Sequence, residues 1–256
     1  MAELQIHQFP CLSDNYGVLI HDADAGVTAS IDAPEAAAVE RALESTGWRL
    51  THILTTHHHA DHTGGHAELK QKTGCTIVGP RGEADKIPGI DVSVGEGDTY
   101  TFGNFVARVF ETPGHTSGHI VYYFPDAQVV FVGDTLFALG CGRLLEGTAE
   151  QMWSSLKKLM QLPPETAVYC GHEYTQSNAR FALAVDPDNA ELQARAREID
   201  ALRAQDKPTL PTTIGLELAT NPFLRAEDES IQRHLGMVGA DPVQVFAEIR
   251  RRKDTF

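Results

Sequence analysis

Four histidines and one aspartate lie within eight residues of this chain, in the segment TTHHHADH at 55–62. Imidazole is the commonest protein ligand for zinc-like metals, and a carboxylate adds negative charge to a divalent-metal site. The segment is internal, since it follows the apolar pair Ile53-Leu54 and precedes Gly64-Gly65, and this argues against an expression tag. The residue types and their spacing therefore predict a metal site.

Three more ligand-type side chains follow short apolar runs, each next to a glycine. They are His115 in PGHT, Asp134 in VGDT and His172 in CGHE. The apolar runs are predicted strands, and glycine lets another backbone approach closely. Because strand ends at one edge of a sheet sandwich converge on one place, we expect these three side chains to share a site with the segment 55–62.

The alternation inside the first segment predicts two metal centres. His57 and His59 are two residues apart, so in extended backbone they point the same way and His58 points away. Asp61 and His62 follow a turn of the chain and can face a second centre. Two metal ions about 3.5–4 Å apart are a known catalytic arrangement for hydrolysis.

The predicted elements before about residue 173 alternate between strands and helices. Strands are expected at 4–9, 16–20, 27–31, 51–55, 76–78, around 102, and at 105–109, 120–124 and 129–132. Helices are expected at 34–43 and 64–72. This pattern predicts an α+β fold over residues 1–173, with helices covering stacked sheets in an αββα sandwich.

Beyond Glu173 the pattern becomes mainly helical. Helices are expected at 178–184, 190–204, 227–235 and 242–253. The segment KPTLP at 207–211 is expected to be an extended linker, because proline and the residue before it disfavour helix. We therefore expect a smaller helical C-terminal domain over residues 174–256.

Composition and charge limit the classes of molecule that we expect this protein to bind. The formal net charge is −14, which repels nucleic acid and anionic membranes, so we expect neither as a partner. An anionic substrate would need a local basic patch. The four cysteines form no C-x-x-C pair and the first residues contain no signal-peptide pattern, which predicts reduced thiols in a cytoplasmic protein. No exposed apolar stripe is evident, so we expect a monomer.

The motif T-H-x-H-x-D-H, with the later His, Asp and His at strand ends, resembles the metallo-β-lactamase fold family. Within it, the chain resembles the hydroxyacylglutathione hydrolases, or glyoxalase II enzymes. The segments that carry this closer resemblance are FPCLSDNY at 9–16, GCGR at 140–143, GHEYT at 171–175, NPFLR at 221–225 and RRRKD at 250–254. The resemblance thus covers nearly the whole chain, with a catalytic domain at 1–173 and a substrate-binding domain at 174–256.

The resemblance implies two divalent metal ions, zinc first, with iron and manganese as alternatives. The implied ligands of the first ion are His57, His59 and His115. Those of the second ion are Asp61, His62 and His172. Asp134 bridges the ions, and the catalytic carboxylates Asp61 and Asp134 supply charge and orient the nucleophile.

The implied reaction is hydrolysis of S-2-hydroxyacylglutathione, such as S-D-lactoylglutathione, to D-lactate and glutathione, the second step of methylglyoxal detoxification. A metal-bridging hydroxide would attack the thioester carbonyl. The chemistry is reasonable because a free thiol has a pKa near 8.5, so the thiolate departs without a strong general acid. An amide would need its nitrogen protonated, and no acid in these motifs is evident for that step.

The expected substrate-binding residues lie mostly near the end of the chain. Arg250 and Lys253 follow Phe246 at helical spacing, i+4 and i+7, and could bind a substrate carboxylate. Cations at a helix C-terminus also complement the helix dipole, so a purely structural role is the alternative. The resemblance favours binding, and adds Arg143 and Tyr174.

One departure and several rival functions remain open. In the family a tyrosine often follows two positions after a basic residue at 143, and here that position is Leu145, which leaves the thiol carrier less certain than the chemistry. A persulfide dioxygenase-like enzyme with one iron, or a lactonase of the same fold, is the alternative enzyme. A zinc-storage or structural-zinc protein is the non-enzyme alternative, but such sites are usually closed and Cys-rich.

Overall fold

A computed structural model describes residues 3–256. Residues 1 and 2 lie outside the described residues. They belong to the predicted domain 1–173 and to the first residues that were searched for a signal-peptide pattern. The chain divides into two units: the first holds the residues up to Glu111 and Thr116–Gly133, and the second holds Thr112–His115 and Asp134–Phe256. The domain boundary that the sequence pattern places after Glu173 stays a prediction.

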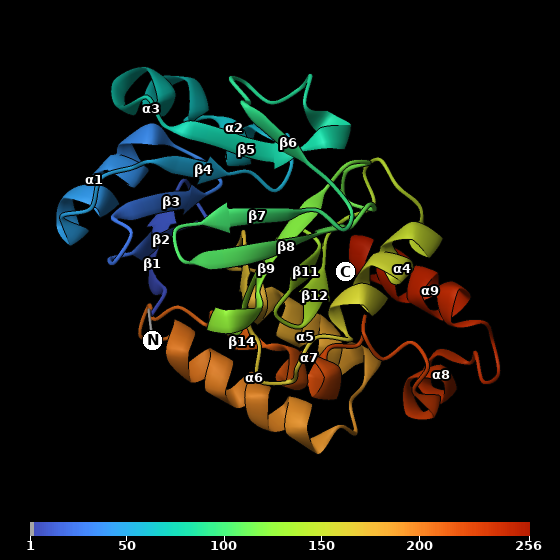
Figure 1. Ribbon diagram of the computed structural model, residues 1–256. Coiled ribbons are helices and arrows are strands. Elements are labelled where there is room, and N and C mark those ends of the chain that lie inside the picture. Colours follow the sequence, from blue (N-terminus) through green and yellow to red (C-terminus); the bar gives the residue numbers. More distant parts are fainter. Residues whose placement is uncertain (1–2) are drawn as a thin grey trace. The chain divides into compact units, whose positions relative to one another are not determined.

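The first unit contains a six-stranded sheet in the order β1-β2-β3-β4-β5-β6 (Figure 1). Its strands are β1 (Gln5–Cys11), β2 (Asn15–Asp22), β3 (Val27–Ile31), β4 (His52–Leu54), β5 (Thr76–Pro80) and β6 (Val92–Val94). The strands β3 to β6 run parallel. Parallel strands place their carboxyl ends at one edge, which is where ligand sites of such sheets form. The segment 55–62 therefore begins at this edge, with the residues that follow β3 and β5 beside it.

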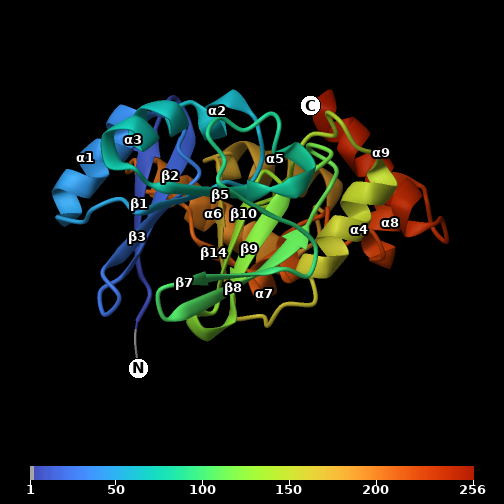
Figure 2. The same cartoon turned by 45° about the horizontal axis from the view of Figure 1, so that its top comes forward.

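Helices cover one face of this sheet (Figures 1 and 2). They are α1 (Ala36–Thr46) and α3 (His66–Thr73), and a single turn, α2 (Ala60–Thr63), precedes α3. Both longer helices end at a glycine with positive φ, Gly47 at 72° and Gly74 at 69°. Glycine adopts this left-handed C-cap without the steric penalty of other residues. Their apolar sides pack on the sheet in a buried core that includes Leu19, Val39 and Leu69.

A second sheet begins with four antiparallel strands of the first unit, β7 (Thr99–Phe102), β8 (Phe105–Glu111), β9 (Ile120–Phe124) and β10 (Val129–Gly133). In the second unit, β13 (Ala167–Cys170) pairs antiparallel with β14 (Thr212–Thr213). Short 3₁₀ turns lie at η1 (Arg81–Glu83) and η2 (Pro125–Ala127).

In the first unit, strand β9 of the second sheet contacts the first two residues of the segment 55–62, which follows β4 of the first sheet. The buried Tyr122 hydroxyl donates to the Thr55 carbonyl at 2.9 Å, and the Ile120 N–H donates to the Thr56 carbonyl at 2.9 Å. Buried backbone carbonyls are costly to leave unpaired. These two bonds therefore fix the first residues of the segment against β9.

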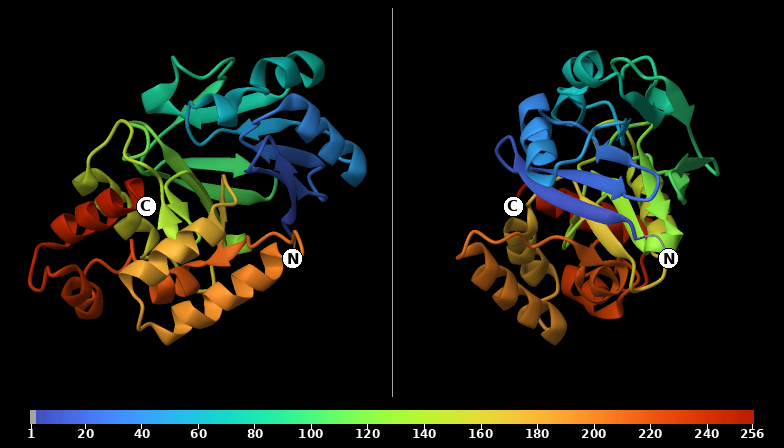
Figure 3. Two further views of the ribbon diagram at one scale, coloured as in Figure 1. Left: turned by 180° about the vertical axis from the view of Figure 1, so that it is seen from behind. Right: turned by 60° about the vertical axis from the view of Figure 1, so that its left-hand side comes forward.

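The second unit is mainly helical. Its helices are α4 (Ala149–Leu159), α5 (Thr175–Val185), α6 (Ala190–Arg203), α7 (Ile214–Thr220), α8 (Glu229–Leu235) and α9 (Pro242–Asp254). A hairpin of β11 (Leu136–Phe137) and β12 (Gly140–Cys141) follows Asp134. The helices α5 and α6 lie side by side (Figure 3) and bury a core that includes Ala182, Leu192 and Ile199. Helix α4 packs on α9, where the rings of Trp153 and Phe246 are 5.9 Å apart.

The helices expected at 178–184, 190–204, 227–235 and 242–253 are present as α5, α6, α8 and α9. The sequence prediction missed α4 and α7. Helix α4 opens with a capping box, in which the Thr148 hydroxyl accepts from the Gln151 N–H and the Gln151 side chain accepts from the Thr148 N–H. That pattern is a helix-start signal that the sequence itself contains.

All four cysteines are buried and none forms a disulfide. Burial raises the pKa of the Cys11 and Cys170 thiols to about 12 and that of Cys141 to about 11. A thiol is nucleophilic only as the thiolate, so these cysteines are poor nucleophiles at neutral pH. Over residues 3–256, no helix is both long and apolar enough to cross a membrane.

Candidate metal centre

The first group of predicted ligands lies in the loop after β4. His57 is fully buried, and its Nε2 lies 3.2 Å from Nδ1 of His59. The Thr56 hydroxyl donates to Asp32 Oδ2 at 2.8 Å, so it can accept from His57 Nδ1, 3.0 Å away. This places the His57 proton on Nδ1. The lone pair of Nε2, on the side of His59, is then available to a metal.

His62 is oriented by the carboxylate of Asp32, a residue that was not predicted from the sequence to belong to the site. Its Nδ1 lies 2.8 Å from Oδ2 of Asp32, the residue directly after β3, and both residues are buried. Oδ1 of Asp32 accepts from the Thr56 N–H at 2.7 Å. A carboxylate on one ring nitrogen fixes the tautomer and makes the other nitrogen a better ligand. The sequence did contain a signal for this role, because Asp32 directly follows the predicted strand 27–31, as the predicted ligands follow theirs.

Asp61 is held by Asn15, from the SDNY segment. The Asn15 amide donates to both the carbonyl and Oδ2 of Asp61, at 3.2 Å each. Oδ2 of Asp61 lies 3.6 Å from Nε2 of His62. The short helix α2 begins with these residues, so Asp61 and His62 present neighbouring donor atoms.

The remaining histidines of the first unit have other contacts. His58 points to Glu83, whose carboxylate accepts from the His58 N–H at 2.8 Å and lies 2.9 Å from the His58 ring. The buried His119 ring stacks on His57 with centroids 4.7 Å apart. His66 is buried in a core position, where burial lowers its pKa to about 4.

The second group of predicted ligands belongs to the second unit. Oδ2 of Asp134 lies 3.4 Å from Nε2 of His115 and 3.4 Å from Nε2 of His172. The other ring nitrogen of His115, Nδ1, lies 3.0 Å from the Arg143 carbonyl oxygen, which can only accept. His115 is therefore protonated on Nδ1 and offers Nε2 as a ligand atom. One carboxylate oxygen thus faces two imidazole nitrogens.

Close backbone approach explains the glycines around His115 and Asp134. A Cβ on Gly142 would lie 2.0 Å from the Asp134 carbonyl oxygen, far inside van der Waals contact. Gly114 has φ of 150° and packs against Met152 of α4. The Gly147 N–H donates to the Gly114 carbonyl at 3.0 Å. The loop 142–147 is thereby fixed beside the turn that carries His115.

Behind this loop, a buried polar network supports the hairpin that follows Asp134. The Asn221 amide donates to the carbonyls of Phe137 and Gly140, at 3.2 and 3.0 Å. Glu217 accepts from the Leu139 N–H at 2.8 Å and pairs with the buried Arg195 at 2.5 Å. The NPFLR segment therefore contributes to the site indirectly, by holding backbone.

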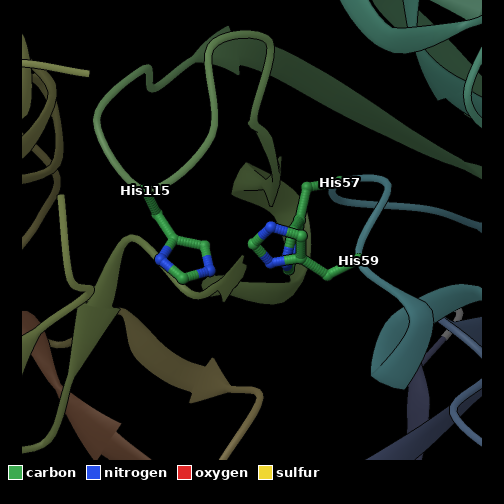
Figure 4. A group of neighbouring side chains, drawn as sticks. All are labelled: His57, His59 and His115. Carbon is green, nitrogen blue, oxygen red and sulfur yellow. The ribbon is translucent and has the colours of Figure 1, made fainter. Parts of the chain in front are cut away.

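Each unit thus presents its own set of candidate ligand atoms: those of His57, His59, Asp61 and His62 in the first unit, and those of His115, Asp134 and His172 in the second. Figure 4 shows the side chains of His57 and His59 on the loop after β4, and that of His115 on the turn after β8.

These side chains fit divalent metal ions. Two ligand atoms about 2.1 Å from one tetrahedral ion lie about 3.4 Å apart, which matches the separations of Asp134 Oδ2 from its two histidines. Imidazole and carboxylate ligands suit zinc, iron and manganese. The residues present therefore support binding of two divalent ions.

The four predicted substrate-binding residues all belong to the second unit. Tyr174 stacks on His172, with centroids 4.7 Å apart and the rings 4° from parallel. Arg143 is exposed. Arg250 is buried: its Nη1 donates to the Cys141 carbonyl at 2.9 Å, and its other nitrogens donate to Asp254. Arg250 thus has a structural role in fastening α9 to β12, besides any contact with substrate.

Lys253 lies near these cations and is half-buried. Burial, followed by the charges of Arg250 and Arg143, lowers its pKa to about 8. Arg251 and Arg252 instead pair with Glu248 on their own helix. The helix end therefore presents its cations in two directions, and Arg250 and Lys253 share one side with Arg143.

Comparison with known proteins identifies the relatives of the chain. The family model "Metallo-beta-lactamase superfamily" matches residues 22–172, and "Hydroxyacylglutathione hydrolase C-terminus" matches residues 173–256. Proteins named hydroxyacylglutathione hydrolase from Brucella ovis and Brucella abortus are each 61% identical over 253 residues, which is 99% of this chain and 98% of theirs.

Solved structures have the same fold. The ETHE1 structure from Myxococcus xanthus has a TM-score of 0.70 and 29% identity, covering 96% of this chain and 90% of that one. The structure of TTHA1623 in a di-iron-bound form has a TM-score of 0.63 and 25% identity, covering 86% and 100%. These matches confirm the predicted fold class, a metallo-β-lactamase sandwich followed by a helical C-terminal region.

Proposed function

Because the chain belongs to the hydroxyacylglutathione hydrolase family, we propose that it hydrolyses S-2-hydroxyacylglutathione to a 2-hydroxy acid and glutathione. S-D-lactoylglutathione is the expected substrate and D-lactate the acid, as in the second step of methylglyoxal detoxification. The observation that supports this proposal best is the single Asp134 oxygen, 3.4 Å from both His115 and His172, because a carboxylate oxygen between two imidazole nitrogens could be shared by the two metal ions of a hydrolytic site.

We propose that the seven ligands hold two ions, zinc first, with iron or manganese as alternatives. His57, His59 and His115 would hold one ion. Asp61, His62 and His172 would hold the other, with Asp134 shared. When bound, such ions activate water as a nucleophile at neutral pH and polarise the substrate carbonyl. The di-iron form of TTHA1623 supports a two-ion site and keeps iron among the candidates.

The chain's own residues hold the ligands ready for this chemistry. Asp32, Thr56 and the Arg143 carbonyl each accept from the outward nitrogen of one histidine. The inward nitrogens therefore need no proton rearrangement before they bind a metal. Asn15 fixes Asp61 by donating to its Oδ2 and to its backbone carbonyl. The leaving thiolate, with a pKa near 8.5 as the free thiol, departs without a proton donor from the chain.

We propose that the glutathione part binds in the second unit, to Arg143, Tyr174, Arg250 and Lys253, and that residues 174–256 act as a substrate-binding domain. Three cations near one another counter the net charge of −14 for a substrate with carboxylates. Tyr174 is 37% exposed and can contact substrate while its ring stacks on His172. We also propose that the protein is a cytoplasmic monomer that engages neither nucleic acid nor membrane.

Leu145 bears on the choice of thiol carrier. Its side chain is 59% exposed on the loop that contains Arg143. A leucine cannot donate the hydrogen bond that a tyrosine would offer at this position. We therefore propose weaker recognition of the peptide part of glutathione, with the hydrolytic chemistry unchanged.

An assay of thioester hydrolysis tests the main proposal. The chain, loaded with zinc, iron or manganese, should remove the thioester absorbance of S-D-lactoylglutathione, and chelation should abolish the activity. Metal content measured on the same samples should approach two ions per chain. Absence of hydrolysis with two ions bound would reject the substrate, while one iron per chain would favour the persulfide dioxygenase-like alternative.

A further inference from the structure

Two of the proposed substrate-binding cations rest on aromatic rings. The Arg250 guanidinium carbon lies 5.1 Å from the Phe223 ring centroid. Nζ of Lys253 lies 5.3 Å from the centroid of Phe181 and 5.7 Å from that of Phe256. A cation within about 6 Å of a ring face is attracted by the electron density there. Arg250 therefore has one aromatic partner, and Lys253 has two.

The two rings beside Lys253 form a clamp. Phe181 and Phe256 are 5.4 Å apart with their planes at 73°, an edge-to-face pair. Nζ also donates to the carbonyl and the hydroxyl of Ser177 on α5, at 3.3 Å each. A lysine side chain has about 2 kcal/mol of rotamer entropy to lose when it is fixed. The clamp and Ser177 together restrict the Lys253 side chain.

The two rings of the clamp differ in their surroundings. Phe181 is 2% exposed and stacks on Phe223, with centroids 5.9 Å apart, so it belongs to the core. Phe256 is 67% exposed and follows α9. A core ring cannot be removed without opening a cavity. Phe256 can be changed with little effect on the fold, so its contact with Lys253 can be tested by itself.

The charges around Lys253 explain why its ammonium group would need aromatic contacts to stay in place. Arg143 and Arg250 both act on the Lys253 ammonium unfavourably, and Asp254 acts favourably. Repulsion among neighbouring cations would drive a free lysine side chain out into water. The negative faces of two rings offset part of this repulsion without neutralising the charge, as a carboxylate would.

We propose that Phe256 is a positioning residue, which closes an aromatic clamp on the Lys253 ammonium and holds it beside Arg143 and Arg250 to receive a carboxylate of the thiol carrier. This inference rests on the proposed function. In this proposal Phe256 acts through Lys253 on binding of the carrier and takes no part in the attack on the carbonyl. Its loss should therefore raise KM and leave kcat nearly unchanged.

Three substitutions test the clamp on the full-length, metal-loaded protein. Phe256→Leu keeps an apolar side chain but removes the ring, and its KM for S-D-lactoylglutathione should rise about two- to fivefold, the effect of an exposed cation–ring contact. Phe256→Tyr keeps the ring and should restore the wild-type KM. Val238→Ala, at a side chain that is 59% exposed between α8 and α9, is the matched control and should change nothing.

Binding of glutathione, measured by calorimetry, should follow the same order among the variants, and equal Tm values will show that all are folded. An unchanged KM in Phe256→Leu overturns the clamp, as does a Phe256→Tyr variant that binds as weakly as Phe256→Leu. If the metal-loaded wild-type chain neither hydrolyses the thioester nor binds glutathione, the proposed function fails and the clamp fails with it. Normal turnover with equal KM in all variants rejects the clamp alone.

Discussion

At the scale of single residues, the histidines of the candidate centre are set by their outward hydrogen bonds. His57 donates to Thr56, His62 to Asp32 and His115 to the Arg143 carbonyl. Each acceptor belongs to the same unit as its histidine, so the orientation of each ring is fixed by contacts within that unit. The Asp32–His62 pair is the strongest of the three, because the acceptor is a buried carboxylate.

Replacing Asp32 by asparagine tests this pair. The amide can turn its NH₂ toward His62 Nδ1, which would move the ring proton to the nitrogen that faces the metal. Affinity for the second ion should then fall about 10- to 100-fold. Titration of the metal-free protein with zinc, in competition with a chromophoric chelator, measures this. Asp24→Asn, at an exposed aspartate of the same unit, should bind as wild type; equal affinity in both variants would remove Asp32 from the site.

Lys253 should give KM a pH dependence. Its pKa is lowered to about 8, so the side chain is a cation below that pH and neutral above it. If it binds a substrate carboxylate, KM should rise as pH increases through 8. Lys253→Arg stays charged throughout and should lack this rise. Initial rates between pH 6.5 and 9.5, corrected for spontaneous hydrolysis, compare the two, and parallel profiles would mean that Lys253 does not contact the substrate.

At the scale of elements, α4 and α9 act as a pair. The box of Thr148 and Gln151 caps α4, and Trp153 of α4 packs on Phe246 of α9. Helix α9 in turn carries Arg250, which bonds to the backbone of β12. The end of α9 is thus held by packing against a helix and by an arginine anchored to the hairpin that follows Asp134.

Loss of the α4 cap should weaken this arrangement measurably. Thr148→Ala removes the hydroxyl that accepts from the Gln151 N–H, and should lower the free energy of unfolding by about 1 kcal/mol. Urea unfolding should show a lower midpoint with an unchanged slope. Thr148→Ser retains the hydroxyl and should unfold close to wild type. If both variants unfold alike, the methyl group of Thr148 stabilises the helix start instead.

At the scale of the whole molecule, regular local patterns were predictable and long-range supports were not. The strand 27–31 and the helices α5, α6, α8 and α9 follow from apolar spacing, proline and glycine. Asp32 was missed as a functional residue because its partner, His62, lies thirty residues away and only the fold brings them together. Arg250 was expected to bind a substrate carboxylate or to complement the dipole of its helix, and nothing in the sequence showed that its guanidinium would donate to the Cys141 carbonyl.

We expect Asp134 to affect both the metal content of the protein and its thermal stability in the presence of metal. If it bridges two ions, Asp134→Ala should lose most of both, and metal analysis of the variant should find well below two per chain. Because metals bind the folded state only, the Tm of the variant should no longer rise when zinc is added. Asp126→Ala, at an exposed aspartate, serves as the control. Two ions retained by Asp134→Ala would contradict the bridging role.

The loop 142–147 has a consequence for how this protein can diversify. Its backbone is fixed by bonds to the His115 turn and by the space that Gly142 and Gly147 leave, while Leu145 extends into solvent. Variation at Leu145 can therefore alter the outer surface next to Arg143 without displacing His115 or Asp134, two of the proposed metal ligands. A mutational library at this one position would therefore show which thiol carriers the proposed site accepts while the proposed metal ligands stay unchanged.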